Sequence, residues 1–146
     1  MVLTDEAMTL AVGARLAAQV RAGDVVTLAG SLGVGKTTLA RGVLCALGYT
    51  GDVPSPSYPL VIPYAQPDVR IPIWHVDLYR LDDSREVAEL TLEDAVLDGA
   101  LLIEWPERLG CEWPGALALT LEIAANDARR LTADVPPAWK DRWPFP

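Results

Sequence analysis

Apolar residues recur at every fourth position near the start of the chain, a spacing that places them on one face of a helix. The residues in this series are Met8, Val12, Leu16 and Val20. Thr4 or Asp5 can cap the helix N-terminus, and Gly23 follows its expected end. The pattern predicts an amphipathic helix that buries this stripe.

Short apolar runs further along the chain predict the strands of a sheet. Three of them lie at 24–30, 71–77 and 100–105. Two more, at 117–123 and 129–135, are separated by the short segment "AANDA" and predict a closing β-hairpin.

Two further segments are predicted to be helical. The segment 36–48 follows the first strand closely and ends on Gly48, a residue that suits the stopping position of a helix. The acidic segment 83–99 can be capped by Asp83 or Ser84. Its residues expected to face inward are Leu90, Leu92 and Val96.

Proline-rich segments interrupt this pattern at two places. The segment 52–64 contains four prolines and predicts an ordered loop that runs into a short strand. The tail, 135–146, is also rich in proline and is assigned no secondary structure. We expect its tryptophans, Trp139 and Trp143, to strap over an apolar surface. With no internal repeat and no low-complexity linker, residues 1–146 are predicted to form one domain.

Composition narrows the class of partner. Of the 146 residues, 51% are hydrophobic and 22% are charged, an ordinary balance for a soluble domain. The formal net charge is −8, and no cluster of five basic residues occurs. Because non-specific nucleic-acid binding depends on Lys and Arg contacts to phosphate, direct binding of tRNA or DNA is disfavoured. A basic protein surface is the expected partner.

The same composition predicts a cytoplasmic protein with no membrane segment. No run of 18 apolar residues occurs, and the acidic N-terminus, interrupted by Gly13 and Arg15, does not resemble a secretory signal. Cys45 and Cys111 lack the spacing of a disulfide framework or a metal site, so two reduced, buried thiols are predicted.

One motif carries recognisable chemistry. The segment "GSLGVGKTT" fits the pattern G-x-x-x-x-G-K-[ST] with Gly30, Gly35, Lys36 and Thr37, and it joins a predicted strand to a predicted helix. Glycines let backbone N–H groups turn toward phosphates at the helix N-terminus. Lys36 can contact the β- and γ-phosphates, and the Thr37 hydroxyl can ligate Mg²⁺. The sequence predicts an α/β fold: a single-domain, P-loop NTPase-like sheet flanked by helices.

A phosphate loop needs a carboxylate near its metal. Glu104 ends one apolar run and Asp77 ends another, and parallel strands would bring both to the loop edge. We expect one to approach the metal and the other to act beside it. His75, the only histidine, is expected to be a packed, hydrogen-bonded residue rather than a catalyst. The guanine-specific elements N-K-x-D and D-x-x-G are missing, which favours adenine as the base.

Four segments together resemble one family. In order, "GSLGVGKTT", "SPSYPLVIPY", "HVDLYRL" and "IEWPE" are similar to the TsaE (YjeE) family of small bacterial ATPases, over residues 4–132. The resemblance implies a sheet with helices on both sides, ATP and Mg²⁺ as cofactors, and a complex with the TsaB and TsaD proteins. It also implies a role in making threonylcarbamoyladenosine beside the tRNA anticodon, with tRNA contacted only through the complex.

The resemblance also implies roles for individual residues. It places Mg²⁺ at Thr37 and Glu104, gives Asp77 a part in hydrolysis, and puts Ser57 and Tyr58 in a switch-like loop. Trp105 matches a position beside the metal carboxylate. The residues implied to bind nucleotide are Glu6, Gly33, Val34, Gly35, Lys36, Thr37 and Thr38.

Two positions depart from the family pattern. Ser31 stands where the family usually has an acidic residue, and Ser57 stands where it usually has threonine. Serine keeps the hydroxyl but lacks the methyl group that stiffens threonine, so the loop is expected to order less firmly.

Three function classes remain open from the sequence. The first is an ATPase that drives or resets a tRNA-modifying assembly. The second is a small-molecule kinase, although the segment 51–71 offers one arginine, Arg70, and little length for a lid. The third is a nucleotide-dependent binding module that does not turn over. An assay with labelled ATP, with and without partners, separates them.

Overall fold

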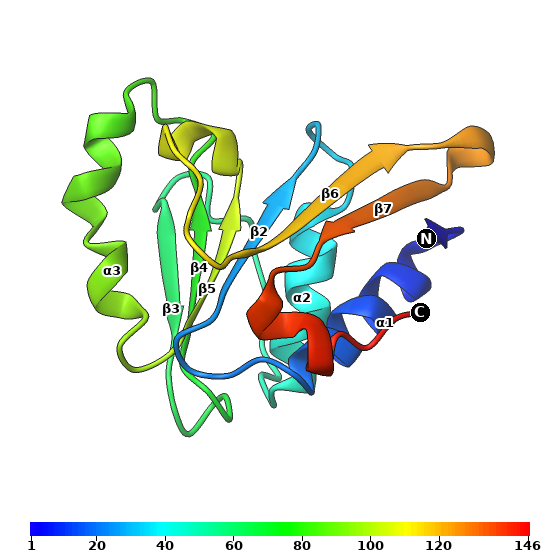
Figure 1. The fold of residues 1–146 in the computed structure, drawn as a ribbon, viewed down its shortest axis with the longest axis horizontal. Helices are drawn as coiled ribbons and strands as arrows, with labels where there is room; N and C mark the ends of the chain where they lie inside the picture. Colours follow the sequence, from blue (N-terminus) through cyan, green and yellow to red (C-terminus); the bar gives the residue numbers. More distant parts are fainter.

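Seven strands form one mixed sheet in the order β1-β7-β6-β2-β5-β4-β3 (Figure 1). The computed structural model describes all residues, 1–146. Strands β4, β5, β2 and β6 run parallel, and antiparallel strands complete both sides. The strands are β1 (Val2–Leu3), β2 (Val25–Ala29), β3 (Val61–Tyr64), β4 (Ile73–Asp77), β5 (Ala100–Glu104), β6 (Leu117–Ile123) and β7 (Arg129–Asp134).

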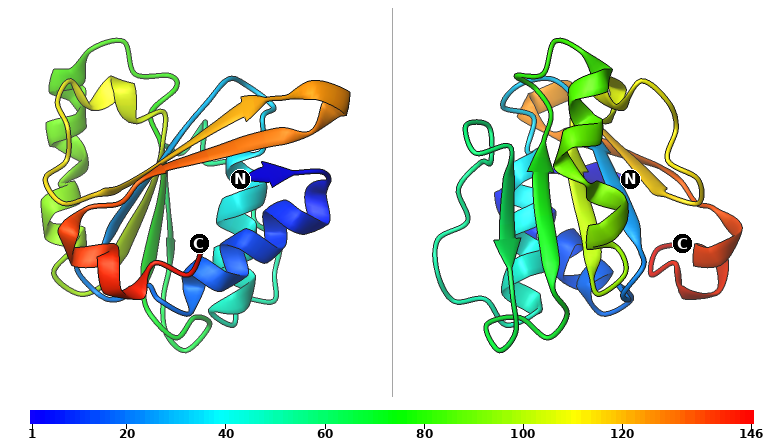
Figure 2. Two further views of the ribbon diagram at one scale, coloured as in Figure 1. Left: turned by 45° about the vertical axis from the view of Figure 1, so that its right-hand side comes forward. Right: turned by 90° about the vertical axis from the view of Figure 1, so that its left-hand side faces the viewer.

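Helices cover both faces of this sheet. Helices α1 (Glu6–Ala17) and α2 (Lys36–Ala46) pack together on one face, over the larger hydrophobic core. The 3-10 helix Ser84–Leu90 and α3 (Leu92–Ala95) cover the strands at the other end on the opposite face (Figures 1 and 2). The predicted α/β sheet flanked by helices, with a closing hairpin of β6 and β7, is confirmed. None of the helices has both the length and the apolar character that a membrane crossing requires.

Helix α1 begins as predicted, and three of the four residues of the predicted stripe, Val12, Leu16 and Val20, are buried. The Asp5 side chain caps the helix by accepting a hydrogen bond of 2.8 Å from the Met8 backbone N–H. Met8 itself is 39% exposed, so its predicted place in the core is wrong. Strict four-residue steps drift around a helix of 3.6 residues per turn, and the buried stripe passes through Thr9 instead. Gly13 allows close packing, because a Cβ there would lie 2.4 Å from the Leu39 carbonyl oxygen of α2.

The acidic segment does not form the single helix that was predicted. Asp83 caps a 3-10 helix, and Thr91, in the left-handed conformation with φ of 51°, separates it from α3. Because this break redirects the chain, only Leu92 of the three expected inward residues is fully buried. Leu90 and Val96 are partly buried against the smaller core.

The tail adopts a 3-10 helix at Pro137–Arg142, where no secondary structure was predicted. Trp139 is 1% exposed and belongs to the larger core, and Trp143 packs against that core. Two hydrogen bonds of 2.6 Å join the Arg142 guanidinium to the Asp24 carboxylate. The tail therefore straps over an apolar surface beside α1, as the tryptophans suggested (Figure 2). Strand β1, which pairs with β7, was missed.

Both cysteines are free, but the prediction that they are buried is wrong. Cys45 lies on the solvent side of α2, whose opposite side carries the buried residues. Cys111 is exposed in the connection between β5 and β6.

Candidate functional site

The glycine-rich loop joins the end of β2 to the start of α2. Gly30 has φ of 142°, and a Cβ at this position would lie 2.4 Å from the Leu121 carbonyl oxygen, so only glycine fits. Gly35, with φ of 118°, is the N-cap of α2 and provides no side-chain cap. The first N–H groups of α2 therefore remain available to an anion at the positive end of the helix dipole.

Lys36 spans this loop from the first turn of α2. Its Nζ donates hydrogen bonds to the carbonyl oxygens of Gly30 (2.7 Å) and Ser31 (2.8 Å). It also lies 4.3 Å from the centre of the Trp105 ring. Burial lowers the pKa of Lys36, and the carboxylates of Glu104 and Asp77 offset only part of that effect. The lysine is thus held over the loop with several partners for its charge.

The two strand-end carboxylates lie next to each other. Asp77 and Glu104 are register partners at the ends of the parallel strands β4 and β5, and Glu104 is also the register partner of Leu28 in β2. Both side chains are buried. The Thr37 hydroxyl donates a hydrogen bond of 2.8 Å to Glu104 Oε1. This contact joins the phosphate loop to the strand end, as the sequence pattern indicated.

The surroundings give the two carboxyl groups opposite acidities. Burial raises the pKa of Glu104, but His75, the Thr37 hydroxyl and Asp77 together more than offset burial, so the net pKa lies below its usual value. Burial is also the main influence on Asp77 and raises its pKa. Hydrogen bonds from Tyr79 and Ser57 oppose that rise, while the charge of Glu104 adds to it. Glu104 is therefore the ionised carboxylate of the pair, and Asp77 holds a proton more readily.

The proline-stiffened loop meets the site at Asp77. Ser57 and Ser55 donate hydrogen bonds to Asp77 Oδ2, of 2.9 Å and 3.3 Å, and the Tyr79 backbone N–H donates to Oδ1 (2.8 Å). Tyr58 points outward and is 82% exposed, with the Arg80 guanidinium 4.6 Å from its ring centre. The two residues of the predicted switch thus point in different directions. Ser57 faces the Asp77 carboxylate, and Tyr58 faces solvent.

Two adjoining hollows lie along the phosphate loop. The first, called the phosphate hollow below, has a volume of about 270 Å³. It is formed by the loop, both serines, the carboxylate pair and Trp105. The second, of about 230 Å³, shares Gly33, Gly35 and Thr38 with the first. Its other lining residues are Leu3, Asp5, Glu6, Thr9, Val34, Asp127 and Arg129.

Part of the second hollow was missed from the sequence. Asp127 and Arg129 reach it from the β6–β7 hairpin, and Arg129 Nε donates a hydrogen bond of 2.9 Å to the Val34 carbonyl oxygen. No local motif marks these residues, because the folding back of the hairpin alone brings them to the loop. Glu6 lines this hollow and lies 3.6 Å from Arg41, whereas the Val34 side chain is buried in the core.

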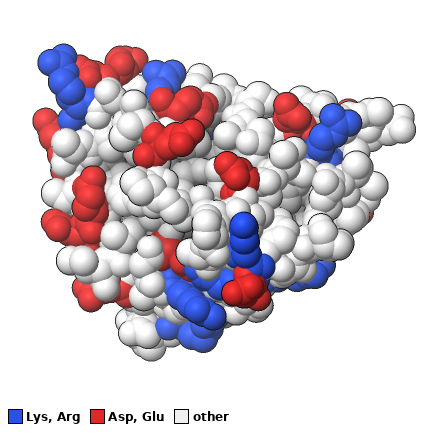
Figure 3. Space-filling model, viewed as in Figure 1, with Lys and Arg blue, Asp and Glu red and all other residues white.

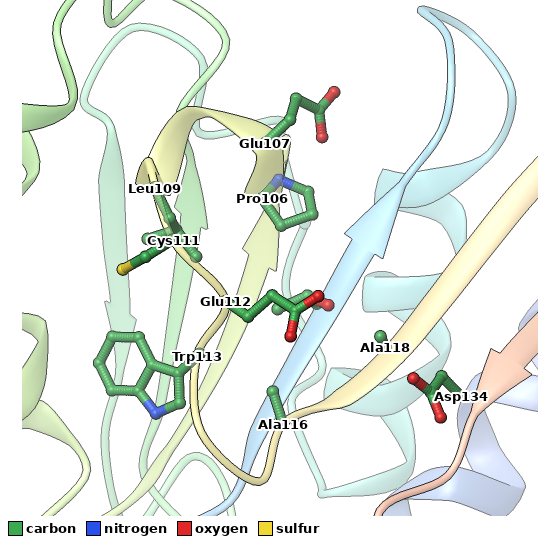
Figure 4. A pocket seen from close by; sticks show the side chains of 10 residues that line it. Pro106, Glu107, Leu109, Cys111, Glu112, Trp113, Ala116, Ala118 and Asp134 are labelled. Atoms are coloured by element: carbon green, nitrogen blue, oxygen red, sulfur yellow. The ribbon is translucent and has the colours of Figure 1, made fainter.

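The largest cavity lies away from the phosphate loop (Figure 4). It measures about 450 Å³, and its lining includes the carboxylates of Glu107, Glu112 and Asp134 but no lysine or arginine. Carboxylates repel phosphate, so this cavity is a poor site for a nucleotide. The two hollows beside the loop are the better candidates.

The predicted site residues are thus placed as follows. The ones that meet in the phosphate hollow are Gly33, Gly35, Lys36, Thr37, Thr38, Asp77 and Glu104. Glu6 lies in the adjoining hollow. Val34 offers only its backbone. The roles of these residues in binding and hydrolysis stay predictions.

The sequence matches the family model "Threonylcarbamoyl adenosine biosynthesis protein TsaE" over residues 3–132. The chain belongs to the TsaE family. A TsaE protein from Nostoc is 40% identical over 112 residues, which cover 73% of this chain and 67% of that protein. A TsaE protein from Bacillus subtilis is 35% identical over 126 residues, covering 85% of this chain and 77% of that protein. Both are named tRNA threonylcarbamoyladenosine biosynthesis protein TsaE.

A solved structure extends the TsaE similarity to the whole fold. The crystal structure of Bacillus YdiB superposes with a TM-score of 0.81 and 28% sequence identity, covering 97% of this chain and 87% of that chain. A third relative, from Streptomyces coelicolor, is 42% identical over 96 residues, which cover 65% of each protein. Aligned segments in the first TsaE relatives thus span about two thirds of their length.

Proposed function

We propose that this TsaE-family chain binds Mg²⁺-ATP across the two adjoining hollows and hydrolyses it in the service of tRNA threonylcarbamoyladenosine biosynthesis. The observation that carries the proposal is the 2.8 Å hydrogen bond from Thr37 to Glu104. This contact brings a phosphate-loop hydroxyl and an ionised strand-end carboxylate to one point, as a nucleotide-bound metal requires.

The side chains present fit Mg²⁺ better than other metals. Thr37 and Glu104 offer hard oxygen ligands. The structure contains no group of three or more His, Cys, Asp or Glu side chains that could hold a metal by themselves. Mg²⁺ usually keeps several water ligands and is coordinated by one or two protein carboxylates together with substrate phosphates. We assign Thr37 and Glu104 to hold it, and when bound it would neutralise charge on the phosphates.

The adjoining hollow suits the base and sugar of the nucleotide. It opens directly from the phosphate hollow through Gly33, Gly35 and Thr38. Carboxylates of Asp5 and Asp127 line it, and such acceptors suit the exocyclic amino group of adenine. Glu6, at the start of α1, is included in this part of the site.

Asp77 is the candidate for handling the attacking water. It lies beside Glu104, and its raised pKa brings it closer to the range in which a carboxylate accepts a proton. Ser55 and Ser57 hold one of its oxygens, so movement of their loop would alter its orientation. In this proposal the loop senses the γ-phosphate through Asp77.

The partners proposed are the TsaB and TsaD proteins, with tRNA contacted only through them. Acidic side chains gather over the 3-10 helix Ser84–Leu90 and α3, at the left of the view in Figure 3. Together with the net charge of −8, this surface disfavours direct contact with RNA phosphates. A cytoplasmic location completes the proposal, and the two free thiols are compatible with it.

Replacing Lys36 by Ala is expected to weaken ATP binding strongly while the fold persists. Lys36 is the only lysine or arginine that lines the phosphate hollow. Loss of its charge-assisted contact should cost about 1.5–3 kcal/mol or more of binding free energy. Calorimetric titration with ATP measures this loss.

The matched control for this variant is Lys140→Ala. Lys140 is the other lysine of the chain and is exposed in the tail helix. The Lys140→Ala substitution should leave ATP affinity unchanged. Equal affinity of the Lys36→Ala and parent proteins would remove the basis for the phosphate site.

A further inference from the structure

His75 is a buried side chain whose polar atoms lack ordinary partners. It is the only histidine of the chain, lies in β4 and is 0% exposed. Neither ring nitrogen has a hydrogen-bond partner within normal geometry. Buried polar groups are nearly always paired, so a fully buried imidazole with two unpaired nitrogens calls for an explanation.

Its nearest charged neighbour is the candidate metal carboxylate. His75 Nε2 lies 3.5 Å from Glu104 Oε1, the same oxygen that accepts the Thr37 hydrogen bond. The parallel register explains this closeness. His75 pairs with Leu102 and Asp77 pairs with Glu104, so these side chains share one face of the sheet. A shift of about half an ångström would bring the pair to an ordinary N–H···O distance.

We propose that His75 is a positioning residue whose Nε2–H donates a hydrogen bond to Glu104 Oε1. With Thr37 it fixes one oxygen of the carboxylate. Both of these contacts go to Oε1, so neither of them occupies the other oxygen, Oε2, which can face a cation. This last step rests on the proposed Mg²⁺-ATP function, whereas the imidazole contact does not.

The choice of nitrogen follows from the surroundings. Nδ1 has no acceptor nearby, so a proton there would be a buried, unpaired donor. A proton carried on Nε2 leaves only an unpaired acceptor at Nδ1, which proteins tolerate better. Outer partners of this kind orient metal ligands in many sites, and their removal typically weakens metal affinity by about 10–100-fold.

Nitrogen NMR of the nucleotide-free protein tests the contact directly. Because the chain has a single histidine, the imidazole ¹⁵N signals belong to His75 without further assignment. We expect a proton on Nε2, with an Nε2 signal that moves in the Glu104→Gln variant. A ring protonated on Nδ1, or an Nε2 signal that Glu104→Gln leaves in place, would overturn the proposal. This test needs no ATP, so its outcome is separate from that of the proposed function.

Variants of His75 test the consequence for the cation. Mn²⁺ affinity in the presence of ADP, measured by electron paramagnetic resonance, should fall by about 10–100-fold in His75→Leu. His75→Gln keeps an N–H donor at the position of Nε2 and should restore most of the affinity. ADP affinity without metal should stay unchanged in both variants, with circular dichroism as the check on folding.

The variants also separate the two proposals. Equal Mn²⁺ affinities for His75→Leu, His75→Gln and the parent protein would overturn the positioning role. If the parent protein binds no ADP, the proposed function fails while the NMR result still decides the imidazole contact. If His75→Leu does not fold, the NMR result on the parent protein again decides.

Discussion

Glu104→Gln is expected to lower the rate of ATP hydrolysis by about 10²-fold or more while ATP binding persists. In the proposed function the phosphates are bound by the glycine-rich loop, Lys36 and the start of α2, so binding does not require Glu104. The variant keeps an oxygen near Thr37 but loses the charge that a metal requires. Single-turnover hydrolysis and equilibrium titration, measured on the same protein, separate the two effects.

Asp77→Asn is expected to have the same signature. It should preserve ATP binding and lose about 10²-fold or more in hydrolysis, because an amide cannot accept the proton of an attacking water. Glu107→Gln is the matched control, since Glu107 is exposed, close in sequence to Glu104, and lines the other cavity. If either site variant hydrolyses ATP at the parent rate, the substituted carboxylate has no role in hydrolysis.

The second expected result is slow hydrolysis by the isolated chain and faster hydrolysis with the TsaB and TsaD proteins. No arginine lines the phosphate hollow, so Lys36 is its only lysine or arginine, and in the proposed function a partner supplies a further cation. An arginine supplied by a partner typically raises the rate by about 10³–10⁵-fold. Steady-state release of phosphate, with and without the partners, measures the increase.

The exposed residues around the hollow suggest how a partner reaches it. Leu32 at the tip of the phosphate loop and Tyr58 of the serine loop are both exposed, the latter packed against Arg80. Exchanging Tyr58 for Ser should therefore reduce stimulation by partners and leave hydrolysis by the isolated chain unchanged. Stimulation of parent and Tyr58→Ser proteins to the same extent would exclude this loop from the docking surface.

Local sequence predicted the parts of the site that local physics controls. The loop from Gly30 to Thr37 needs glycines with positive φ and a helix that follows directly. Both can be predicted from residues that are adjacent in the sequence. Asp77 and Glu104 each end an apolar run, and parallel pairing alone brings such ends together. The sequence alone therefore predicts these features.

The parts that failed depend on contacts between distant segments. Asp127 and Arg129 reach the second hollow only because the hairpin folds back over the loop. Trp139 packs into the larger core and anchors the tail there. The Arg142–Asp24 ion pair also holds the tail, and it links positions far apart in the chain. Periodicity also could not locate the break at Thr91, where the backbone leaves the helical region.

The central claim is that the phosphate loop and the carboxylate pair act together to hydrolyse ATP. ATP labelled in its γ-phosphate, incubated with this chain, the TsaB and TsaD proteins and tRNA, tests it most directly. We predict that the label appears as inorganic phosphate, that partners accelerate its release, and that Glu104→Gln abolishes the acceleration. Transfer of the label to a small metabolite, at a rate indifferent to partners and tRNA, would contradict the account and indicate a kinase.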